Sequence, residues 1–418
     1  MDKFFYIIFI NIYPLIAMLL SPFNNKAKLW LEGRRKIFEK IEATITDRNT
    51  KKIWMHCASL GEFEQGRPLL EKFKELFPSY KLVLTFFSPS GYEVQKNSTI
   101  ADYIFYLPID SSNNAKKFLD LIQPSLIVFV KYEYWYYYLK ESGNRKIPLL
   151  LVSGIFLPEF SFFKWYGNMR REMLHFFTHF FVQTENSKQL LETVNIKNVS
   201  VSGDTRFDRV LEIATEIKTF IEIEHFINNT KTIVAGSTWI DDDEVLDHYA
   251  NTHSELKFII APHDIQKDRL KECSKLYKNS ILYSNYINNP ASANEKINTL
   301  IIDNIGTLKF LYRYATICYV GGGFGNGIHN ILEAAVYYKP VVFGPAYEKF
   351  SEAIELIDKG GAFDVEDAIE LEDELNELLS DESLYTQASK IAGDYVKNHS
   401  GATDAIIQYI QENRLATN

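Results

Sequence analysis

The chain has 418 residues, 46% hydrophobic and 24% charged, a composition that excludes a disordered or collagen-like protein at a length that exceeds one typical domain. A formal net charge of −9 excludes a general attraction for nucleic acid, so no nucleic-acid partner is expected. The three cysteines lie far apart and form no CxxC pair, which excludes a disulfide framework and is typical of a reducing compartment.

The first predicted element is a hydrophobic helix. From Phe4 to Asn25 no side chain is charged, and this length just suffices for a helix that spans a bilayer, which needs about 20 residues. Pro14 would interrupt such a helix, and Asn11 is unfavourable in hydrocarbon. Three interpretations stay open: a membrane-spanning helix, a signal peptide without a clear cleavage site, and a helix in the membrane interface or packed on the fold.

A basic segment follows this helix. Residues 26–52 contain nine basic and four acidic side chains, a net charge of +5 on an acidic protein. Such a flank stays on the cytoplasmic side of a membrane and attracts anionic headgroups; the alternative is a solvated helical face. We expect residues 1–25 to form a membrane anchor or monotopic segment, with the rest of the protein in the cytoplasm.

Beyond residue 50, short apolar runs alternate with amphipathic stretches, which predicts βα units with parallel strands. Helices are expected between the runs, for example at Glu64–Leu76 and Ala115–Ile122. The first series of predicted strands is Ile53–Cys57, Leu82–Phe86, Tyr103–Tyr106, Leu126–Val130, Leu149–Val152 and Phe180–Val182. The second series is Ile233–Ala235, Phe258–Ala261, Ile281–Tyr283, Thr299–Ile302, Ile317–Val320 and Val341–Phe343.

Two series of similar size predict two doubly wound α/β domains, residues 26–205 and 206–418. The last helix is a candidate for packing back on the first domain. The acidic run from Asp364 to Glu382 is expected to be a solvated helical face late in the second domain. Because ligands of open α/β sheets bind beyond the carboxyl ends of strands, the residues just after each apolar run are the candidates for chemistry.

Ser59-Leu60-Gly61-Glu62 follows the first predicted strand. The spacing of Ser59 and Glu62 is typical of a capping box at a helix start, and the sequence alone favours this structural role. The functional alternative is that Gly61 lets a substrate approach closely while Glu62 is a general base. A helix N-terminus keeps a carboxylate ionised but weakens it as a base, so spacing does not decide between the two.

The densest glycine cluster lies in YATICYVGGGFGNGIHNILEAA, residues 314–335. A strand leads into Gly321-Gly322-Gly323, and a helix is expected to open near Asn330. Glycine permits positive φ and close backbone approach, the helix start offers amides to a phosphate, and Glu333 is placed to accept ribose hydroxyls. The pattern is neither GxGxxG nor a P-loop. The alternative is a tight connection without a ligand, but the glycine density and the HNxxE pattern favour a ligand site.

Two further loops, Ala261-Pro262-His263-Asp264 and Asp303-Asn304-Ile305-Gly306-Thr307, follow strands of the second series. Each alone is an ordinary turn. Together with the glycine cluster they predict three ligand-binding loops at one edge of a sheet.

Two groups of potential metal ligands have simpler explanations. Asp241-Asp242-Asp243-Glu244 suggests a DxD metal motif, but Asp241 and Glu244 also have the spacing of a helix cap, and acids in a first turn favour the helix dipole. His175 and His179 have the i,i+4 spacing of one helical face, yet no third ligand is evident. We therefore expect a cap at the first group, a core or surface role for the histidines, and no metal site.

Taken in order, these motifs resemble those of the Kdo transferases, membrane-associated glycosyltransferases that move 3-deoxy-D-manno-octulosonic acid (Kdo) from CMP-Kdo onto lipid A precursors. The similarity runs from the hydrophobic N-terminus to Val365. IWMHCASLGEFEQGRPLL is similar to the segment with the family's catalytic glutamate, and GGGFGNGIHNILEAAVYYKPVVFGP to its nucleotide-binding stretch. The other matching segments are TFFSPSGYE, YLPID, KYEYW, VSGDTRFD and AGSTWIDDDE.

The resemblance implies an α/β protein of the GT-B fold, in which two Rossmann-like domains face a cleft and bind the acceptor lipid and the CMP-sugar, respectively. It implies that Glu62 takes a proton from an acceptor glucosamine hydroxyl, which attacks the anomeric carbon with inversion, near Ser59 and Gly61. Glu133 and Arg206 would orient or stabilise the reacting groups. The residues implied to contact CMP are Pro262, His263, Ile305, Gly306, Thr307, Asn330, Ile331, Leu332 and Glu333.

The same resemblance implies a place in lipopolysaccharide inner-core biosynthesis, at the cytoplasmic face of the inner membrane. The partners would be CMP-Kdo, a lipid A precursor of the lipid IVA type and the inner-membrane surface, with no metal or other cofactor. Two alternatives stay open: another GT-B glycosyltransferase that uses a UDP- or GDP-sugar, and a catalytically silent, membrane-attached nucleotide-binding module.

This chain departs from the family pattern at several positions. Lys131 stands where E-x-E-x-W has its first acid, and His263-Asp264 replaces the Arg-His of P-R-H. Ile305-Gly306-Thr307-Leu308 replaces M-G-E-L, and Arg206 replaces a lysine, which keeps the charge but changes its geometry. These departures bear on the roles of single residues more than on the reaction class.

Overall fold

The structure, a computed structural model, describes residues 2–216, 218–290 and 296–417. The chain divides into two compact units, one that ends at Arg209 and also includes the residues from Ser400 onward, and one from Val210 to His399. Residues 206–209 fall in the first unit rather than the second, and the residues from Ser400 onward, which include the last helix, belong to the first unit as well. The boundary lies inside a helix, α10 (Thr205–Thr215).

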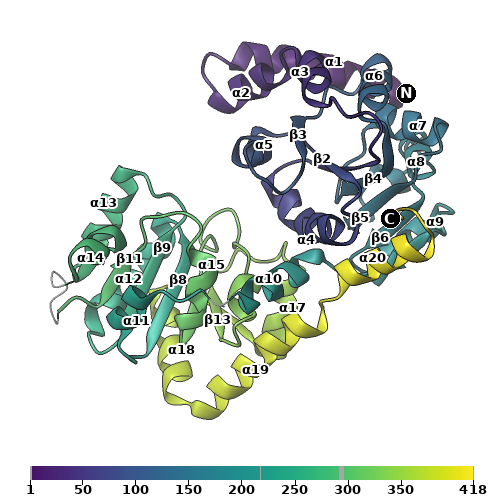
Figure 1. Cartoon of the computed structure of the whole chain (residues 1–418). Helices are drawn as coiled ribbons and strands as arrows, with labels where there is room; N and C mark the ends of the chain where they lie inside the picture. Colours follow the sequence, from purple (N-terminus) through teal and green to yellow (C-terminus); the bar gives the residue numbers. More distant parts are fainter. Residues whose placement is uncertain (1, 217, 291–295, 418) are drawn as a thin grey trace. The chain divides into compact units, whose positions relative to one another are not determined.

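The first unit is built on a parallel seven-stranded sheet in the order β3-β2-β1-β4-β5-β6-β7 (Figure 1). Its strands are β1 (Lys52–Cys57), β2 (Lys81–Phe86), β3 (Tyr103–Tyr106), β4 (Pro124–Val130), β5 (Leu149–Gly154), β6 (His179–Val182) and β7 (Val199–Val201). Its helices are α1 (Asp2–Leu20), α2 (Asn25–Arg34), α3 (Ile37–Thr44), α4 (Leu60–Leu76), α5 (Pro89–Gln95), α6 (Ser112–Ile122), α7 (Tyr136–Asn144), α8 (Asn168–Leu174), α9 (Glu185–Thr193) and α20 (Ala402–Glu412), with a 3-10 turn at Ser161–Phe163.

Both faces of this sheet are covered by other elements. Successive residues of a strand point to opposite faces, so neighbouring residues enter different core clusters. Along β1, Trp54 packs in one core cluster with Phe118 and Phe129, whereas Ile53 and Met55 belong to the cluster on the other face. A strand buried on both faces is apolar without alternation, which is why the sequence shows continuous apolar runs.

The second unit has a parallel seven-stranded sheet in the order β10-β11-β9-β8-β12-β13-β14. Its strands are β8 (Thr232–Thr238), β9 (Lys257–Pro262), β10 (Ser280–Leu282), β11 (Thr299–Ile301), β12 (Ile317–Val320), β13 (Val341–Phe343) and β14 (Ala362–Asp364). Its helices are α11 (Ile221–Ile227), α12 (Ile240–Thr252), α13 (Lys267–Leu276), α14 (Tyr283–Asn288), α15 (Leu308–Leu311), α16 (Leu332–Ala335), α17 (Ser351–Lys359), α18 (Ala368–Ser380) and α19 (Glu382–Asn398), with a 3-10 turn at Tyr312–Tyr314.

The predicted α/β class with two Rossmann-like sheets is confirmed. Every predicted strand corresponds to a strand of the structure, although β10 ends at Leu282 rather than Tyr283. The sequence analysis missed β7 and β14, which are three-residue strands at the edges of their sheets. So short a run carries too little periodicity to be recognised.

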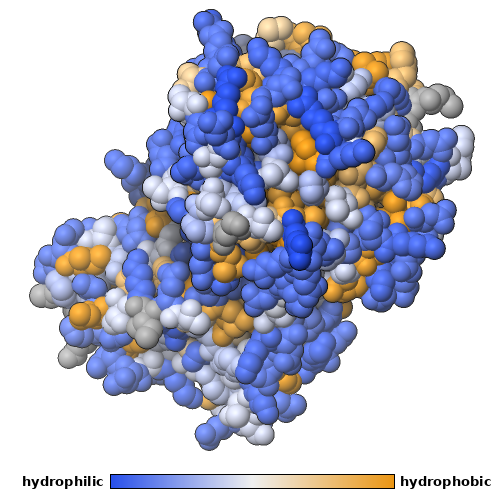
Figure 2. All heavy atoms as spheres, turned by 45° about the vertical axis from the view of Figure 1, so that its right-hand side comes forward, coloured by the Kyte–Doolittle hydropathy of each residue, from blue (hydrophilic) through white to orange (hydrophobic). Residues whose placement is uncertain are grey.

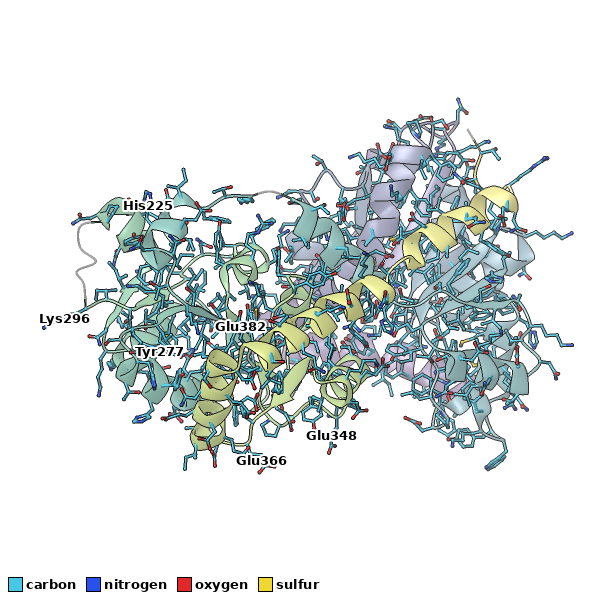
Figure 3. All side chains as sticks on the ribbon, turned by 90° about the horizontal axis from the view of Figure 1, so that it is seen from below. His225, Tyr277, Lys296, Glu348, Glu366 and Glu382 are labelled. Carbon is cyan, nitrogen blue, oxygen red and sulfur yellow. The ribbon has the colours of Figure 1, made fainter. Side chains whose placement is uncertain are left out.

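The acidic run after Asp364 forms α18, as expected, between Glu366 and Glu382 (Figure 3). Leu371, Leu375 and Leu378 face the core while the acids between them are exposed or half-buried. The last helix, α20, contacts α4 and contributes Ile406 and Ile410 to the core of the first unit.

The N-terminal helix α1 is continuous through Pro14 and lies with α2 and α3 on one side of the first unit (Figure 1). Within the described residues it is the helix whose length and composition would suffice to cross a membrane, over Lys3–Leu20. One stripe packs on the unit: the Tyr6 hydroxyl donates to Asp110 at 2.5 Å, and the Tyr13 ring lies 5.0 Å from Trp30. Ile10 and Ala17, on the same stripe, are buried.

The opposite face of α1 is exposed and apolar. Figure 2 shows hydrophobic side chains at the top of the first unit, where α1 lies in Figure 1. The exposed members are Phe4, Phe5, Ile7, Phe9, Ile12, Leu15, Ile16, Met18, Leu19, Leu20 and, just beyond the helix, Phe23. Helix α1 therefore packs on the protein along one stripe and exposes a bare apolar face along the other, as is typical of helices that lie along a surface.

Candidate functional site

The carboxyl end of β1 places Ser59 and Glu62 at the start of α4. Ser59 is the N-cap residue, but its side chain accepts no backbone N–H; instead its hydroxyl donates to the Glu62 carboxylate. The predicted capping box is therefore wrong, because the serine proton satisfies the carboxylate rather than the helix end. Glu62 is partly exposed, and Gly61 beside it is exposed. Glu62 thus presents a hydrogen-bonded carboxylate at the edge of the sheet where ligands of α/β proteins bind.

Glu133, just after β4, is buried within the first unit. Its Oε2 lies 2.7 Å from His56 Nε2 and accepts a hydrogen bond of 2.6 Å from Trp135 Nε1. Two donors on one oxygen fix the carboxylate in place, and at 7% exposure Glu133 meets little solvent. These two bonds favour a role for Glu133 in positioning its neighbours over a role in contacting a substrate.

A chain of hydrogen bonds holds His56 in turn. Trp54 Nε1 donates to Thr85 Oγ1 at 2.8 Å, and Thr85 Oγ1 lies 2.9 Å from His56 Nδ1. His56 Nδ1 also lies 3.1 Å from the Thr85 carbonyl oxygen, and Nε2–H donates to the Glu133 carboxylate. The network joins the ends of β1 and β2 to the loop after β4, which are neighbours in the sheet.

Arg206 lies in the first turn of α10. Its Nε forms an ion pair of 2.8 Å with Asp204, whose other oxygen accepts the Arg206 backbone N–H at 2.9 Å. Asp204 is buried and also accepts both contacts of Gln65 Nε2, at 3.3 Å each. The Thr205 hydroxyl donates to the Gln65 backbone carbonyl, so a hydrogen bond joins the start of α10 to α4.

The three residues predicted to be catalytic belong to the first unit, and each influences the pKa of Tyr132 or of Cys57. Burial raises the pKa of Tyr132, with Glu62 adding to the rise and Arg206 opposing it. Burial also raises the pKa of Cys57, and the charges of Glu62 and Glu133 raise it further. Glu62 therefore acts on Tyr132 together with Arg206, and on Cys57 together with Glu133.

Lys131, the departure in KYEYW, adopts φ +64 directly after β4. Its Nζ lies 5.2 Å from the ring centre of Tyr132. A non-glycine residue in this left-handed region is strained, and such strain is concentrated at functional sites.

In the second unit, three rings from different loops stack beyond the strand ends. The His263 ring, after β9, lies 4.6 Å from Trp239 at 30° and 4.5 Å from His329 at 21°. Trp239 and His329 are nearly coplanar, at 17°, and are joined by a hydrogen bond of 3.2 Å from Trp239 Nε1 to His329 Nε2. Trp239 and His329 thus form one aromatic surface and His263 stacks over it, and stacked rings of this kind can receive a nucleobase.

The bond from Trp239 fixes the protonation state of His329. An imidazole nitrogen that accepts a hydrogen bond carries no proton, so the remaining proton of His329 resides on Nδ1. Burial, together with the charge of His263, lowers the pKa of His329 to about 4. At neutral pH His329 is therefore a neutral ring with an Nδ1–H donor.

Contacts within the protein explain much of the glycine cluster after β12. A Cβ on Gly321 would lie 2.5 Å from the Ser237 carbonyl oxygen, and one on Gly323 would lie 2.5 Å from the Gly344 nitrogen. Gly322 and Gly327 adopt φ +96 and +130, which disfavour a side chain. The predicted need for glycine is confirmed, but close approach of neighbouring chain segments accounts for Gly321 and Gly323.

The acids at the start of α12 are bound by protein groups. Asp242 accepts the backbone N–H groups of Trp239 and Gly322, at 2.8 and 2.9 Å, and so caps the helix and holds the glycine loop. Asp243 accepts from Arg269 and, at 3.0 Å, from Tyr277, labelled in Figure 3. A cap is present, as predicted, although Asp242 makes it rather than Asp241 and Glu244. Across the described parts of the chain no three His, Cys, Asp or Glu side chains gather as metal ligands.

The remaining residues predicted to bind CMP differ in how far their side chains are exposed. Asn330 Nδ2 donates to Glu333 Oε1 at 3.3 Å, and both side chains are half-buried. Ile331, Leu332 and Pro262 are buried, so they can offer a ligand little beyond their backbone.

The loop after β11 is open. Ile305 is 87% exposed, and a Cβ on Gly306, at φ +86, would meet nothing within 4 Å, while the buried Thr307 donates to Asn304. An exposed isoleucine beyond a strand end is an apolar surface available to a ligand.

The two histidines with helical spacing do not share a helix. His175 follows α8, and His179 begins β6. The His179 ring lies 4.2 Å from Tyr409, its Nε2 is 2.8 Å from Ser200 Oγ, and burial lowers its pKa to about 4. The predicted structural role holds, but the helical face is wrong.

Sequence reasoning missed several residues that build these sites: His56, Thr85, Trp135, Asp204, Trp239 and His329. Their signal was their position, since His56 lies near the end of a predicted strand and Trp239 directly follows β8, which is longer than the predicted Ile233–Ala235. Nothing local distinguishes them from core residues, because their partners are distant in the sequence.

The chain matches known proteins along most of its length. Residues 32–209 match the family model described as 3-deoxy-D-manno-octulosonic-acid transferase (kdotransferase). A 3-deoxy-D-manno-octulosonic acid transferase of Aquifex aeolicus is 30% identical over 78% of this chain and 86% of its own length. A bifunctional glycosyltransferase/methyltransferase of Fusobacterium nucleatum is 29% identical over 93% of this chain, which spans 63% of that longer protein.

A solved structure shares the fold. The UDP-GlcNAc 2-epimerase of Neisseria meningitidis is similar with a TM-score of 0.63 over 86% of this chain and 100% of the epimerase. Its 17% sequence identity extends the likeness to the fold alone.

Proposed function

This chain belongs to the family of 3-deoxy-D-manno-octulosonic acid transferases, glycosyltransferases of the GT-B fold, and from that membership we propose that it transfers Kdo from CMP-Kdo to a lipid A precursor. The proposed acceptor is of the lipid IVA type and the process is lipopolysaccharide inner-core biosynthesis. The observation that carries the proposal is the carboxylate of Glu62, held by Ser59 at the carboxyl edge of the first sheet.

The proposed reaction uses Glu62 as general base. A glucosamine hydroxyl of the acceptor gives its proton to Glu62, and its oxygen bonds to the anomeric carbon of Kdo from the face opposite CMP. The bond from that carbon to the CMP phosphate oxygen breaks, the electron pair leaves with CMP, and the configuration inverts. Catalysis by such a base contributes typically about 10²–10⁴-fold.

Glu133 and Arg206 support this step in different ways. Glu133 is fastened by His56 and Trp135, so it orients the loop after β4. Arg206, which is paired with Asp204, acts on Tyr132 as Glu62 does, and its guanidinium would oppose negative charge on the reacting groups. Ser59 and the exposed Gly61 leave the acceptor room beside the base.

The second unit supplies the proposed nucleotide site. The rings of Trp239, His263 and His329 offer a platform for the cytosine, and Nδ1–H of His329 is a donor for a phosphate oxygen. Glu333, positioned by Asn330, accepts ribose hydroxyls. The proposal uses no metal ion, since Asp242 and Asp243 are bound to backbone amides, Arg269 and Tyr277.

The proposed location is the cytoplasmic face of the inner membrane, with α1 lying in the interface. The stripe with Tyr6 and Tyr13 packs on the first unit, so the helix cannot also stand across a bilayer without losing these contacts. The bare apolar face would enter the lipid while the basic segment of residues 26–52 meets anionic headgroups.

The test is an assay with the full chain, CMP-Kdo and lipid IVA, followed by mass spectrometry of the lipid. The expected result is CMP release only in the presence of acceptor, together with a lipid heavier by Kdo. CMP, but not UDP or GDP, should raise the melting temperature, because a ligand that binds the native state stabilises it. Protection by UDP or GDP would indicate another sugar donor, and nucleotide protection without any lipid-linked product a silent module.

A further inference from the structure

A groove of about 300 Å³ opens on the first unit between α1, α2 and the loop after β2. Its walls are mostly apolar, with polar atoms from Asn24, Lys26 and Ser88 and the hydroxyl of Tyr13. The lining side chains are Tyr13, Ile16, Ala17, Leu20, Asn24, Lys26, Ala27, Trp30, Phe87, Ser88 and Pro89.

Contacts of Arg34 and Gly33 with the rest of the first unit hold α2, which forms one wall of the groove, in place. The guanidinium of Arg34 donates to the carbonyl oxygens of Leu107 and Phe87, at 2.9 and 2.8 Å, and lies 4.1 Å from the Trp30 ring centre. Gly33 packs so closely on Tyr106 that a Cβ would lie 2.0 Å from that ring. These contacts make the groove a preformed feature, which a ligand can enter without ordering its walls.

The inner end of the groove adjoins the proposed acceptor residues. The Phe87 ring stacks on Trp135 at 4.7 Å and 29°, and Trp135 donates to Glu133. The backbone N–H of Ser88 donates to the Ala58 carbonyl at 2.7 Å, immediately before Ser59. Phe87 and Ser88, which line the groove, therefore contact the segments that carry Glu133 and Ser59.

The outer end opens onto the bare face of α1. Ile16 and Leu20, each 49% exposed, belong both to the groove and to that face. Lys26 brings a cation to the rim. An apolar groove with one cation, between a lipid-facing helix and a catalytic candidate, has the polarity of a lipid with an anionic sugar head.

We propose that this groove binds one fatty acyl chain of the acceptor, an acylated glucosamine phosphate, with Lys26 beside its phosphate. The inference rests on the proposed function and deepens it, because it assigns the acyl chain to a site on the protein rather than to the bilayer alone. Burial of the chain between α1 and α2 would bring the sugar head toward Glu62, since Phe87 and Ser88 of the groove contact the segments that carry Glu133 and Ser59.

The test uses lipid IVA with a photoreactive diazirine on one acyl chain, mixed with the full-length protein in vesicles and illuminated. Mass spectrometry of the digested protein should place the label on the groove residues, above all α1 and α2. Label confined to the bare face, for example at Phe9 or Leu19, would overturn the proposal. An equal yield in the groove from a diazirine phospholipid at the same concentration would also overturn it, since the groove would then be an ordinary lipid site.

Two pairs of variants sharpen the result. Ala27→Trp fills the groove, whereas Ala43→Trp puts the same ring on the exposed face of α3. Lys26→Glu reverses the rim charge, whereas Lys28→Glu makes the same change on α2 outside the groove lining. Labelling should fall about tenfold in Ala27→Trp, as expected when apolar burial is lost, and should fall in Lys26→Glu with both controls unchanged. The charge pair keeps the test informative should the tryptophan variant fail to fold.

Labelling and turnover separate this inference from the proposed function. Groove labelling without Kdo transfer would support the acyl site while contradicting the transferase proposal. Kdo transfer with labelling elsewhere, or with equal KM for the acceptor in Ala27→Trp and Ala43→Trp, would support the transferase and overturn the acyl site.

Discussion

His56 and Glu133 meet at 2.7 Å inside the first unit, although 77 residues separate them in the sequence. The contact joins the end of β1 to the loop after β4, because these two strands are neighbours in the sheet. Trp135 donates to the same carboxylate oxygen, so Glu133 is the centre of a small buried network. A buried carboxylate with two donors holds its loop in one conformation.

Replacing Glu133 should therefore cost stability before it affects chemistry. Glu133→Ala leaves the N–H groups of His56 and Trp135 without their acceptor, which should lower the free energy of unfolding by about 1–3 kcal/mol. Glu133→Gln keeps an acceptor oxygen and should cost less. Urea denaturation measures both, with the exposed Glu159→Ala as control. Equal stability of Glu133→Ala and the control would contradict the network.

Glu62→Gln should abolish most turnover without unfolding the protein. Loss of a general base lowers the rate by about 10²–10⁴-fold, whereas the amide still accepts the Ser59 hydroxyl. The measurement is CMP release with CMP-Kdo and lipid IVA, alongside thermal protection by CMP, which should persist. Glu75→Gln, at the exposed far end of α4, is the matched control. Turnover near that of the control would remove Glu62 as the base.

Trp239 should contribute to nucleotide binding through its ring and through its N–H. Trp239→Ala removes the stacked surface and should weaken CMP binding about tenfold, in the range found for base stacking. Trp239→Phe keeps a ring but frees Nε2 of His329, so nitrogen-resolved NMR should show His329 losing its single tautomer. Calorimetric titration of CMP measures affinity, and the exposed Trp165→Ala should behave as the unchanged protein. Unaltered affinity in Trp239→Ala would exclude the platform as the base site.

Glu374, on α18, should make stability depend on pH. Burial, with the nearby charges of Glu377 and Asp364, raises the pKa of Glu374 to about 7. While the carboxyl is protonated in both the folded and the unfolded state, its raised pKa does not affect stability. As pH rises from the pKa of the unfolded state through 7, the folded state is destabilised progressively, because it holds the carboxylate less favourably. Glu374→Gln should therefore raise the melting temperature at pH 8 and leave it unchanged near pH 4. A gain of equal size at both pH values would point to a cause other than ionisation.

The bare face of α1 should bind membranes by itself. The double variant Phe9→Asp, Leu19→Asp places charges on that face. Tyr13 loses the Phe9 ring but keeps its contacts with Trp30 and Phe87, and Tyr6 keeps its bond to Asp110, so the fold should persist. Sedimentation with anionic vesicles should recover much less of this variant. Ile221→Asp, an exposed apolar residue of the second unit, is the control. Undiminished recovery would assign binding to the basic segment or to another surface.

Much of the fold follows from local sequence. Continuous apolar runs such as Leu82–Phe86 report strands buried on both faces, and regular alternation with amphipathic stretches reports βα units. The same reasoning identified the need for glycine after β12, because φ and steric space are properties of a few neighbouring residues. It failed at Ser59, where a cap and a hydrogen-bonded carboxylate have the same spacing, and only the rotamers distinguish them.

What the sequence determined by itself was the class of each segment: two parallel sheets, a hydrophobic first helix, and loops of ligand-binding composition after the strands. The tertiary structure decided which of those loops meet. Trp239 and His329, 90 residues apart, share a hydrogen bond because β8 and β12 are adjacent in their sheet. It also decided that one face of α1 is covered and the other bare. Periodicity records how each residue is buried, whereas the pairing of strands and the partner of a helix face arise from contacts between distant segments.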